Sequence, residues 1–147
     1  MSKLAHHLAG AIPTRRRTAQ LTQFHVWSLR THRRRVVKTV YSVESKVKIK
    51  NEVGTSKRSP CGCGTWIDHW KKFSKKSPGV CAVDGCRNNA TAGAHITRPA
   101  AENEDYKTHS YIVPLCDEHN GKHGETFTSR ENCTFVWANV SKTCSAK

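Results

Sequence analysis

The stretch "SYIVPLCDEHN", residues 110–120, decides the expected fold. Its apolar run ends on Cys116, and His119 follows three positions later. Thiolate and imidazole are the ligands that zinc prefers in proteins. A strand that ends on a thiol, with an imidazole just beyond it, therefore predicts half of a metal site.

The other half of this site lies upstream in "CAVDGC", residues 81–86. Gly85 lets the backbone turn tightly enough to direct both cysteine sulfurs to one point. Cys-x4-Cys and Cys-x2-His together supply the four tetrahedral ligands of structural zinc. The alternative is a set of buried free cysteines beside a surface histidine. The spacing favours a structural Zn²⁺ ion held by Cys81, Cys86, Cys116 and His119.

The 29 residues between the two pairs predict a strand, a loop and a second strand. "AGAHIT", residues 92–97, has an extended pattern, whereas "RPAAENEDYKTHS", residues 98–110, is polar and predicts a loop. Pro114 implies an edge position or an irregularity in the second strand. Residues 117–125 predict at most a short helix, because glycines interrupt them.

This order of elements over about residues 80–124 resembles the zinc-containing branch of the HNH endonucleases, with "AHI" on the first strand and "YIVPLC" and "CDEHN" after it. The resemblance implies an α+β fold class, with a small zinc-stabilised treble-clef or ββα-metal domain. It also implies that His95 is the general base that activates water. Asn120, with His123 one helical turn further on, would bind Mg²⁺ or a similar catalytic ion.

Two positions depart from the family pattern. Ala94 stands where the family usually has an aspartate or histidine metal ligand. Tyr111 stands near the position of the middle asparagine. The side chains that could substitute are His109, His123 and Asp105. The alternative for His95 is a structural role inside the small core.

A second group of ligand types precedes this region in "CGCGTWIDHW", residues 61–70. Trp66, His69 and Trp70 share one face of a helical turn, which favours packing against the core over base stacking. Cys61 and Cys63 point in similar directions if the chain is extended. One interpretation is a second metal site, and its candidate ligands are Cys61, Cys63, His69 and Cys144. A disulfide from Cys144 to Cys61 or Cys63, or simple thiols, are the other interpretations.

Charge divides the chain near Pro60. The net charge is +14, and residues 1–60 hold 14 basic side chains against two acidic ones, a balance of +12. Residues 61–147 hold 11 basic and 9 acidic side chains and all seven cysteines. We therefore expect a basic N-terminal extension over residues 1–60, with a short strand around 36–49, and a zinc-binding HNH-like domain over 61–147. Its C-terminal "CTFVWANV", residues 133–140, predicts a strand that covers the zinc core.

The Arg-rich, acid-poor extension is typical of a nucleic-acid-binding arm or a mitochondrial presequence, and a solvated tail is the plain alternative. No apolar run approaches a membrane span. An odd cysteine count without a secretory leader favours a location inside the cell, in the nucleus, cytoplasm or mitochondrion. Our hypothesis is a domain that binds nucleic acid and, as the resemblance implies, hydrolyses phosphodiesters. The alternatives are a non-catalytic zinc module that binds a protein partner, and a redox or metal-storage protein.

Overall fold

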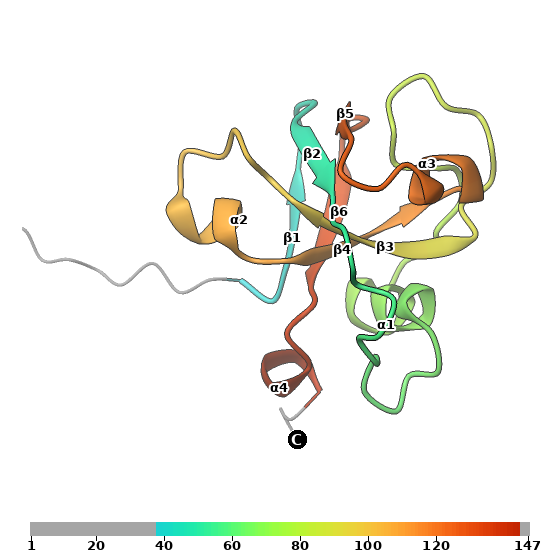
Figure 1. The fold of residues 1–147 in the computed structure, drawn as a ribbon, viewed down its shortest axis with the longest axis vertical. Helices are drawn as coiled ribbons and strands as arrows, with labels where there is room; N and C mark the ends of the chain where they lie inside the picture. Colours follow the sequence, from blue (N-terminus) through green and yellow to red (C-terminus); the bar gives the residue numbers. More distant parts are fainter. Residues whose placement is uncertain (1–37, 145–147) are drawn as a thin grey trace, which may run out of the picture. The chain divides into compact units, whose positions relative to one another are not determined.

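The computed structural model describes residues 38–144. The expectations for an arm or targeting segment fall largely on residues 1–37, which lie outside the described residues. Within the described range the fold is α+β, with one six-stranded antiparallel sheet in the order β1-β6-β4-β3-β2-β5 (Figure 1). The elements are β1 (Val40–Val43), β2 (Lys48–Asn51), α1 (Trp66–Ser74), β3 (Ala92–Thr97), α2 (Glu104–Thr108), β4 (Tyr111–Leu115), α3 (Asp117–Gly121), β5 (Thr126–Thr128), β6 (Cys133–Trp137) and α4 (Val140–Thr143).

The two strands predicted between the ligand pairs form the centre of the sheet as β3 and β4. Pro114 therefore lies in a central strand and not at an edge of the sheet. The irregularity expected there is a local gap in the pairing of β4 with β6. The pairing of β4 with β6 covers only Tyr111 and Ile112, so no neighbouring strand needs the N–H that Pro114 lacks. The Pro114 carbonyl instead accepts a hydrogen bond from the N–H of Ala82 at 2.8 Å, which joins the turn of residues 81–86 to the sheet.

The loop expected over residues 98–110 contains a helix, α2, and the prediction of a plain loop was wrong there. Asn103 caps this helix, since its side chain accepts a hydrogen bond from the N–H of Asp105 at 2.9 Å. Tyr106 of α2 packs on the ring of Tyr41 in β1, with the ring centroids 4.6 Å apart. The segment is thus fixed by a cap and by an aromatic contact to a strand distant in sequence.

The boundary expected at residue 60 falls inside the folded unit. β1 pairs with β6, and β2 pairs with both β3 and β5. Ile49 of β2 is fully buried in the main core. The described residues 38–144 belong to one compact unit. Part of the basic segment therefore belongs to the sheet, because strand pairing with distant residues outweighs the polar local composition.

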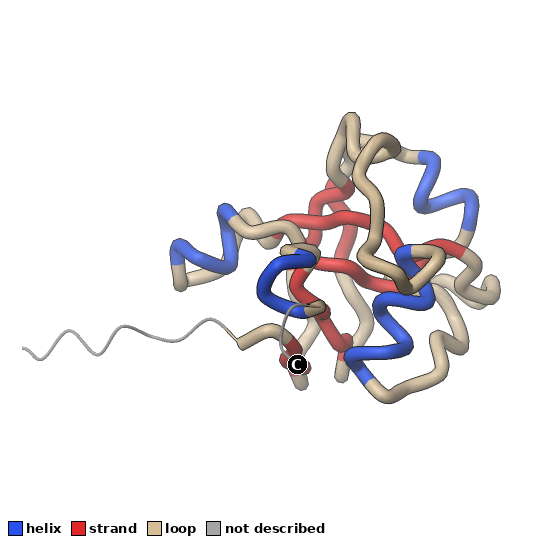
Figure 2. The backbone as a smooth tube through the Cα atoms, turned by 90° about the horizontal axis from the view of Figure 1, so that it is seen from below, coloured by secondary structure: helices blue, strands red, loops and turns tan. Residues whose placement is uncertain are grey.

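The sheet has two covered faces. Ala94, Ile96 and Leu115 point to one face and pack with Cys81 and Cys116 in the main core. The other face is covered by α1 (Figures 1 and 2). Trp70 of this helix packs against Ile112 and Val136. Because side chains alternate along a strand, neighbouring residues of β3 serve different faces. This alternation decides the surroundings of His95.

Helix α1 begins at Trp66 because the Thr65 hydroxyl accepts a hydrogen bond from the N–H of Asp68 at 3.2 Å. It lies so close to β3 that a Cβ on Gly93 would be 2.3 Å from the backbone carbon of Trp66. The Trp70 indole N–H donates to the Thr134 carbonyl at 2.9 Å. Packing of the tryptophans against the core is therefore confirmed for Trp70, whose side chain is buried.

Candidate metal centres

The first centre is the set Cys81, Cys86, Cys116 and His119, and the structure brings all four together. Their ligand atoms lie within 4.8 Å of one another. The Cys116 sulfur is 3.1 Å from Nδ1 of His119 and 3.9 Å from the Cys86 sulfur. The Cys81 sulfur is 3.7 Å from the same ring nitrogen. Neighbouring ligand atoms of tetrahedral zinc stand about 3.5–3.8 Å apart, so this donor set fits the ion.

Two short segments build the first centre. In the turn of residues 81–86, Gly85 adopts a φ of 75°, and the N–H of Cys86 donates to the Val83 carbonyl at 3.2 Å. At the other side, Cys116 ends β4 and forms the N-cap of α3, and one turn of this helix brings His119 back to it. The ligands thus come from a turn and a helix start that the sheet holds in place.

Two thiols of the first centre, those of Cys81 and Cys116, differ in pKa. Burial raises the pKa of the Cys81 thiol to about 11. Burial acts in the same direction on Cys116, but hydrogen bonds from the His119 backbone and ring and from the neighbouring thiols lower its pKa to about 7. Cys116 is therefore the thiol that most readily becomes the thiolate that zinc binds.

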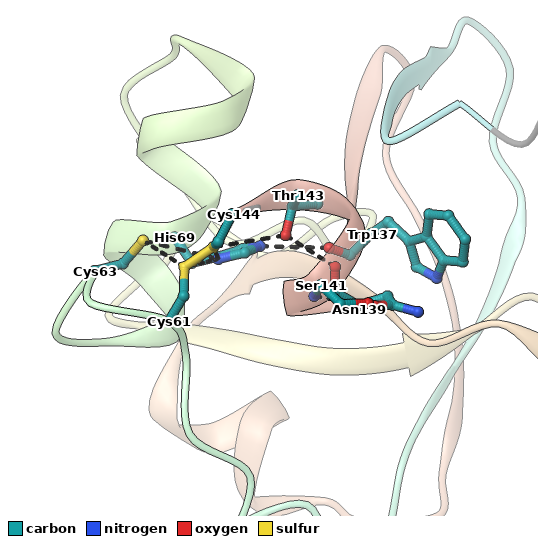
Figure 3. Close-up of a disulfide and its surroundings, with 8 residues drawn as sticks. All are labelled: Cys61, Cys63, His69, Trp137, Asn139, Ser141, Thr143 and Cys144. Atoms are coloured by element: carbon teal, nitrogen blue, oxygen red, sulfur yellow. Dashed lines mark hydrogen bonds between the residues drawn. A yellow bond between two sulfur atoms is a disulfide. The ribbon is translucent and has the colours of Figure 1, made fainter. Parts of the chain in front are cut away.

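The second centre is the set Cys61, Cys63, His69 and Cys144, whose ligand atoms also lie within 4.8 Å of one another (Figure 3). Their three sulfurs surround Nδ1 of His69 at 3.7, 3.9 and 3.8 Å. The sulfurs of Cys61 and Cys63 are 3.2 Å apart. Both candidate clusters therefore have three cysteines and one histidine, a composition consistent with structural zinc.

Three elements build the second centre. His69 is a fully buried residue of α1, and its Nε2–H donates to the Trp137 carbonyl at the end of β6, 3.3 Å away. Cys144 follows α4, which Asn139 caps by accepting a hydrogen bond from the N–H of Ser141 at 3.1 Å. The structure also joins Cys61 to Cys144 by a disulfide, one of the alternatives that the sequence left open.

Cys133 belongs to neither centre. Its side chain is buried in the main core, as expected for a small apolar residue, and burial raises the pKa of its thiol to about 12. In the described part of the chain it is a free thiol.

His95 faces α1 and not the first centre. Its ring lies 4.4 Å from the Trp66 ring, edge to face, and the residue is only 4% exposed. Burial, with smaller contributions from Arg58 and His69, lowers the pKa of His95 to about 4. Within the described residues its buried Nε2 has no hydrogen-bond partner. The ring is neutral at pH 7 and shielded from bulk water.

The other residues of the expected catalytic set lie elsewhere. α3, which carries Asn120, lies against the opposite face of the sheet, where the Asn51 side-chain amide donates to the Asn120 carbonyl at 2.9 Å. His123 follows this helix and is exposed. The structure therefore does not gather His95, Asn120 and His123 at one point.

The positions that depart from the family pattern serve packing. Ala94 and Tyr111 are both buried in the main core. Among the residues considered as substitutes, His109 stacks on Trp137 with ring centroids 4.8 Å apart, and Asp105 lies in the first turn of α2. The described residues hold no group of three His, Cys, Asp or Glu ligands beyond the two cysteine-rich centres.

Sequence reasoning missed Asn51. Its side-chain amide nitrogen is close to three carbonyls of the α3 segment, those of His119, Asn120 and Lys122, at 3.3, 2.9 and 3.2 Å. The residue is buried although it is the last residue of the lysine-rich β2. Only the alternation Lys48, Ile49, Lys50, Asn51 hints that it shares the inward face with Ile49.

No protein-family model, curated protein or solved structure matches the chain. Among residues 38–144, no helix has the length and apolar character needed to span a membrane. The physical account of the two centres therefore rests on the residues of this chain alone.

Proposed function

We propose that this protein is a zinc-stabilised, HNH-like domain that binds nucleic acid without hydrolysing it. The observation that carries the proposal is the first centre, whose two ligand pairs flank β3 and β4, with the second pair at the start of α3, in the order of the HNH zinc branch. The zinc ion would be structural, since four protein ligands leave no open position for water.

The charge of the chain supports nucleic acid as the partner. The described residues 38–144 hold 16 basic side chains against 11 acidic ones, and the whole chain has a net charge of +14. An excess of this size attracts phosphate backbones over long range.

The strands β2 and β5 offer a specific surface for phosphates. Lys48 and Lys50 are exposed, and neither has a carboxylate partner among residues 38–144. Register places Thr128 beside Lys48 and Thr126 beside Lys50, and the Lys48 ammonium donates to the Thr128 hydroxyl at 2.9 Å. Ammonium and hydroxyl groups are common donors to phosphate oxygens. We call this group the lysine face, and it comprises Lys48, Lys50, Thr126 and Thr128.

We propose binding without hydrolysis because the positions expected to be catalytic serve packing instead. Ala94 cannot bind a metal ion, Tyr111 is buried, and His95 is separated by the sheet from α3. A general base must come within hydrogen-bond reach of the water that it activates. His95 lies under Trp66 and is assigned a structural role.

One observation favours nuclease activity as the second candidate function. A buried ring nitrogen without a partner, as at His95, is unusual in a structural role and is found at catalytic sites. In that case the Trp66 side chain would have to move to admit water and substrate.

The binding proposal is tested by titrating labelled duplex DNA and RNA at several salt concentrations. We expect log K to fall steeply with log salt, because binding releases counterions from phosphates. The double variant Lys48→Gln/Lys50→Gln should reduce the slope by roughly 1–2. A matched control, Lys107→Gln/Lys142→Gln, removes the same charge from α2 and α4 and should leave more of the slope. An affinity that does not change with salt concentration would contradict the proposal and favour a protein partner.

Hydrolysis is tested separately by plasmid nicking with Mg²⁺ or Mn²⁺. We expect no nicking by either the wild-type chain or His95→Leu. Nicking by the wild type that His95→Leu abolishes would establish the nuclease and assign His95 as its base.

A further inference from the structure

We propose that Cys61, Cys63, His69 and Cys144 bind a second zinc ion that fixes the C-terminal helix α4 to the start of α1. This inference goes beyond the proposed function and does not depend on nucleic-acid binding.

The distances in the second centre match those of the first. Three sulfurs lie 3.7–3.9 Å from one ring nitrogen. Tetrahedral zinc with bonds of about 2.0–2.3 Å requires sulfur-to-nitrogen separations of roughly 3.5 Å. With the Cys61–Cys144 bond reduced and its two sulfurs separated, an ion could lie at about equal distance from all four ligand atoms.

The surroundings of His69 prepare it as a ligand. Because Nε2–H donates to the Trp137 carbonyl, Nδ1 carries the lone pair and faces the sulfurs. Histidine ligands of zinc commonly donate their second ring N–H to a backbone carbonyl in this way.

A disulfide between Cys61 and Cys144 explains only half of this cluster. It accounts for two sulfurs, and it leaves the Cys63 thiol 3.2 Å from Cys61 and the buried Nδ1 of His69 facing sulfur atoms. A zinc ion uses all four groups. The same ligand types occur in the first centre, where the three cysteines are free thiols.

The segments joined by this ion give it a structural role. α4 contains only four residues, Val140–Thr143, and a helix of this length is not stable by itself in water. Cys144 follows it directly, 83 residues from Cys61. A bond from Cys144 to zinc would hold α4 against the end of β6, next to the Trp137 carbonyl.

Zinc content decides between the ion and the disulfide. The full chain is expressed with zinc, purified under an inert atmosphere without reductant or chelator, and analysed for metal and for total thiols after denaturation. We expect two zinc ions and seven thiols per chain. One zinc ion would overturn the proposal, as would five thiols, because the disulfide removes two of the seven.

Cys63→Ser sharpens the test because Cys63 takes no part in the disulfide. If the second centre binds zinc, this variant should lose one ion of two and keep the first centre. Cys133→Ser, which alters a buried cysteine outside both centres, should keep two. Cys63→Ser with the wild-type zinc content would overturn the proposal. Cobalt substitution gives an independent reading, since the loss of one thiolate-bound site should halve the charge-transfer absorption of the cobalt-loaded chain.

Discussion

The two cysteine-rich centres have the same ligand types and different positions in the chain. The first draws its ligands from residues 81–119, around a single hairpin and the helix after it. The second draws them from residues 61–144, near both ends of the described unit. The first therefore shapes one local structure, whereas the second connects segments that are distant in sequence.

Burial of the ligands also differs between the centres. Cys81 and Cys116 belong to the main hydrophobic core, so the first centre cannot open without exposing it. In the second centre only His69 is buried, and the three cysteines are partly exposed. We therefore expect the first centre to be needed for the fold and the second to add to the stability of a formed fold.

The largest expected effect is therefore loss of the first centre. Cys116→Ser should destabilise the chain by more than about 5 kcal/mol, since structural zinc contributes about 10 kcal/mol and a small domain has little more than this in total. Circular dichroism during heating should show no cooperative transition. Cys144→Ser, the matched change in the second centre, should retain a transition at a lower temperature. Equal melting temperatures for the two variants would contradict the ranking.

A smaller effect is expected from Gly93→Ala, which affects the second centre without altering a ligand. The new methyl group would collide with the Trp66 backbone and push α1, with His69, away from the sheet. We expect a loss of about 3 kcal/mol in the free energy of unfolding and a weaker second zinc site. Urea unfolding and metal titration measure both.

Gly121→Ala is the control beside the first centre. A Cβ at Gly121 would meet nothing within 4 Å, and its φ is not in the left-handed region. Its effect should stay within about 1 kcal/mol, in the stabilising direction, because alanine favours a helix over glycine. A Gly121→Ala change as costly as Gly93→Ala would show that steric contact with α1 is not the cause.

A smaller effect than that of Gly93→Ala is expected from the titration of His95, whose ring packs against Trp66 of α1. Its pKa is lowered from 6.5 to about 4, so between these values the unfolded chain binds more protons than the folded one. The free energy of unfolding should therefore fall as the pH decreases from 6.5 toward 4. After allowance for solvent screening, the contribution is on the order of 2 kcal/mol.

His95→Leu should flatten this pH dependence and cost little at pH 7, because the ring makes no hydrogen bond within the described structure. His123→Gln, at an exposed position, is the control and should keep the wild-type profile. Urea titrations at several pH values provide the measurement. An unchanged slope for His95→Leu would show that other groups cause the acid sensitivity.

The parts that the sequence predicted are those defined by short spacings. The pairs 81/86 and 116/119 each lie within one turn, so the identity of the residues nearly determines the geometry. The strands over 92–97 and 111–115 follow from local patterns in the same way. The sequence could not decide between a metal site, a disulfide and simple thiols for the second centre. Cys144 is distant in sequence from the other three residues, and no local pattern predicts that it lies beside His69.

Long-range pairing also explains the misplaced boundary and the fate of His95. β1 and β2 belong to the sheet only through partners 45 or more residues away, and a lysine-rich segment gives little local sign of this. His95 occupies the expected strand, but which face of the sheet it serves depends on where α1 packs. Residue spacing carries no information on that choice.

The contact of Asn51 with α3 has a consequence for the proposed function. Strand β2 carries Lys48 and Lys50 on its exposed side. On its buried side, the Asn51 side-chain amide holds the end of α3. Removal of zinc would release α3, and β2 would lose the partner that fixes its last residue. Metal occupancy and phosphate affinity should then be thermodynamically linked, so that nucleic acid protects the ion from chelators and zinc strengthens nucleic-acid binding by an equal factor.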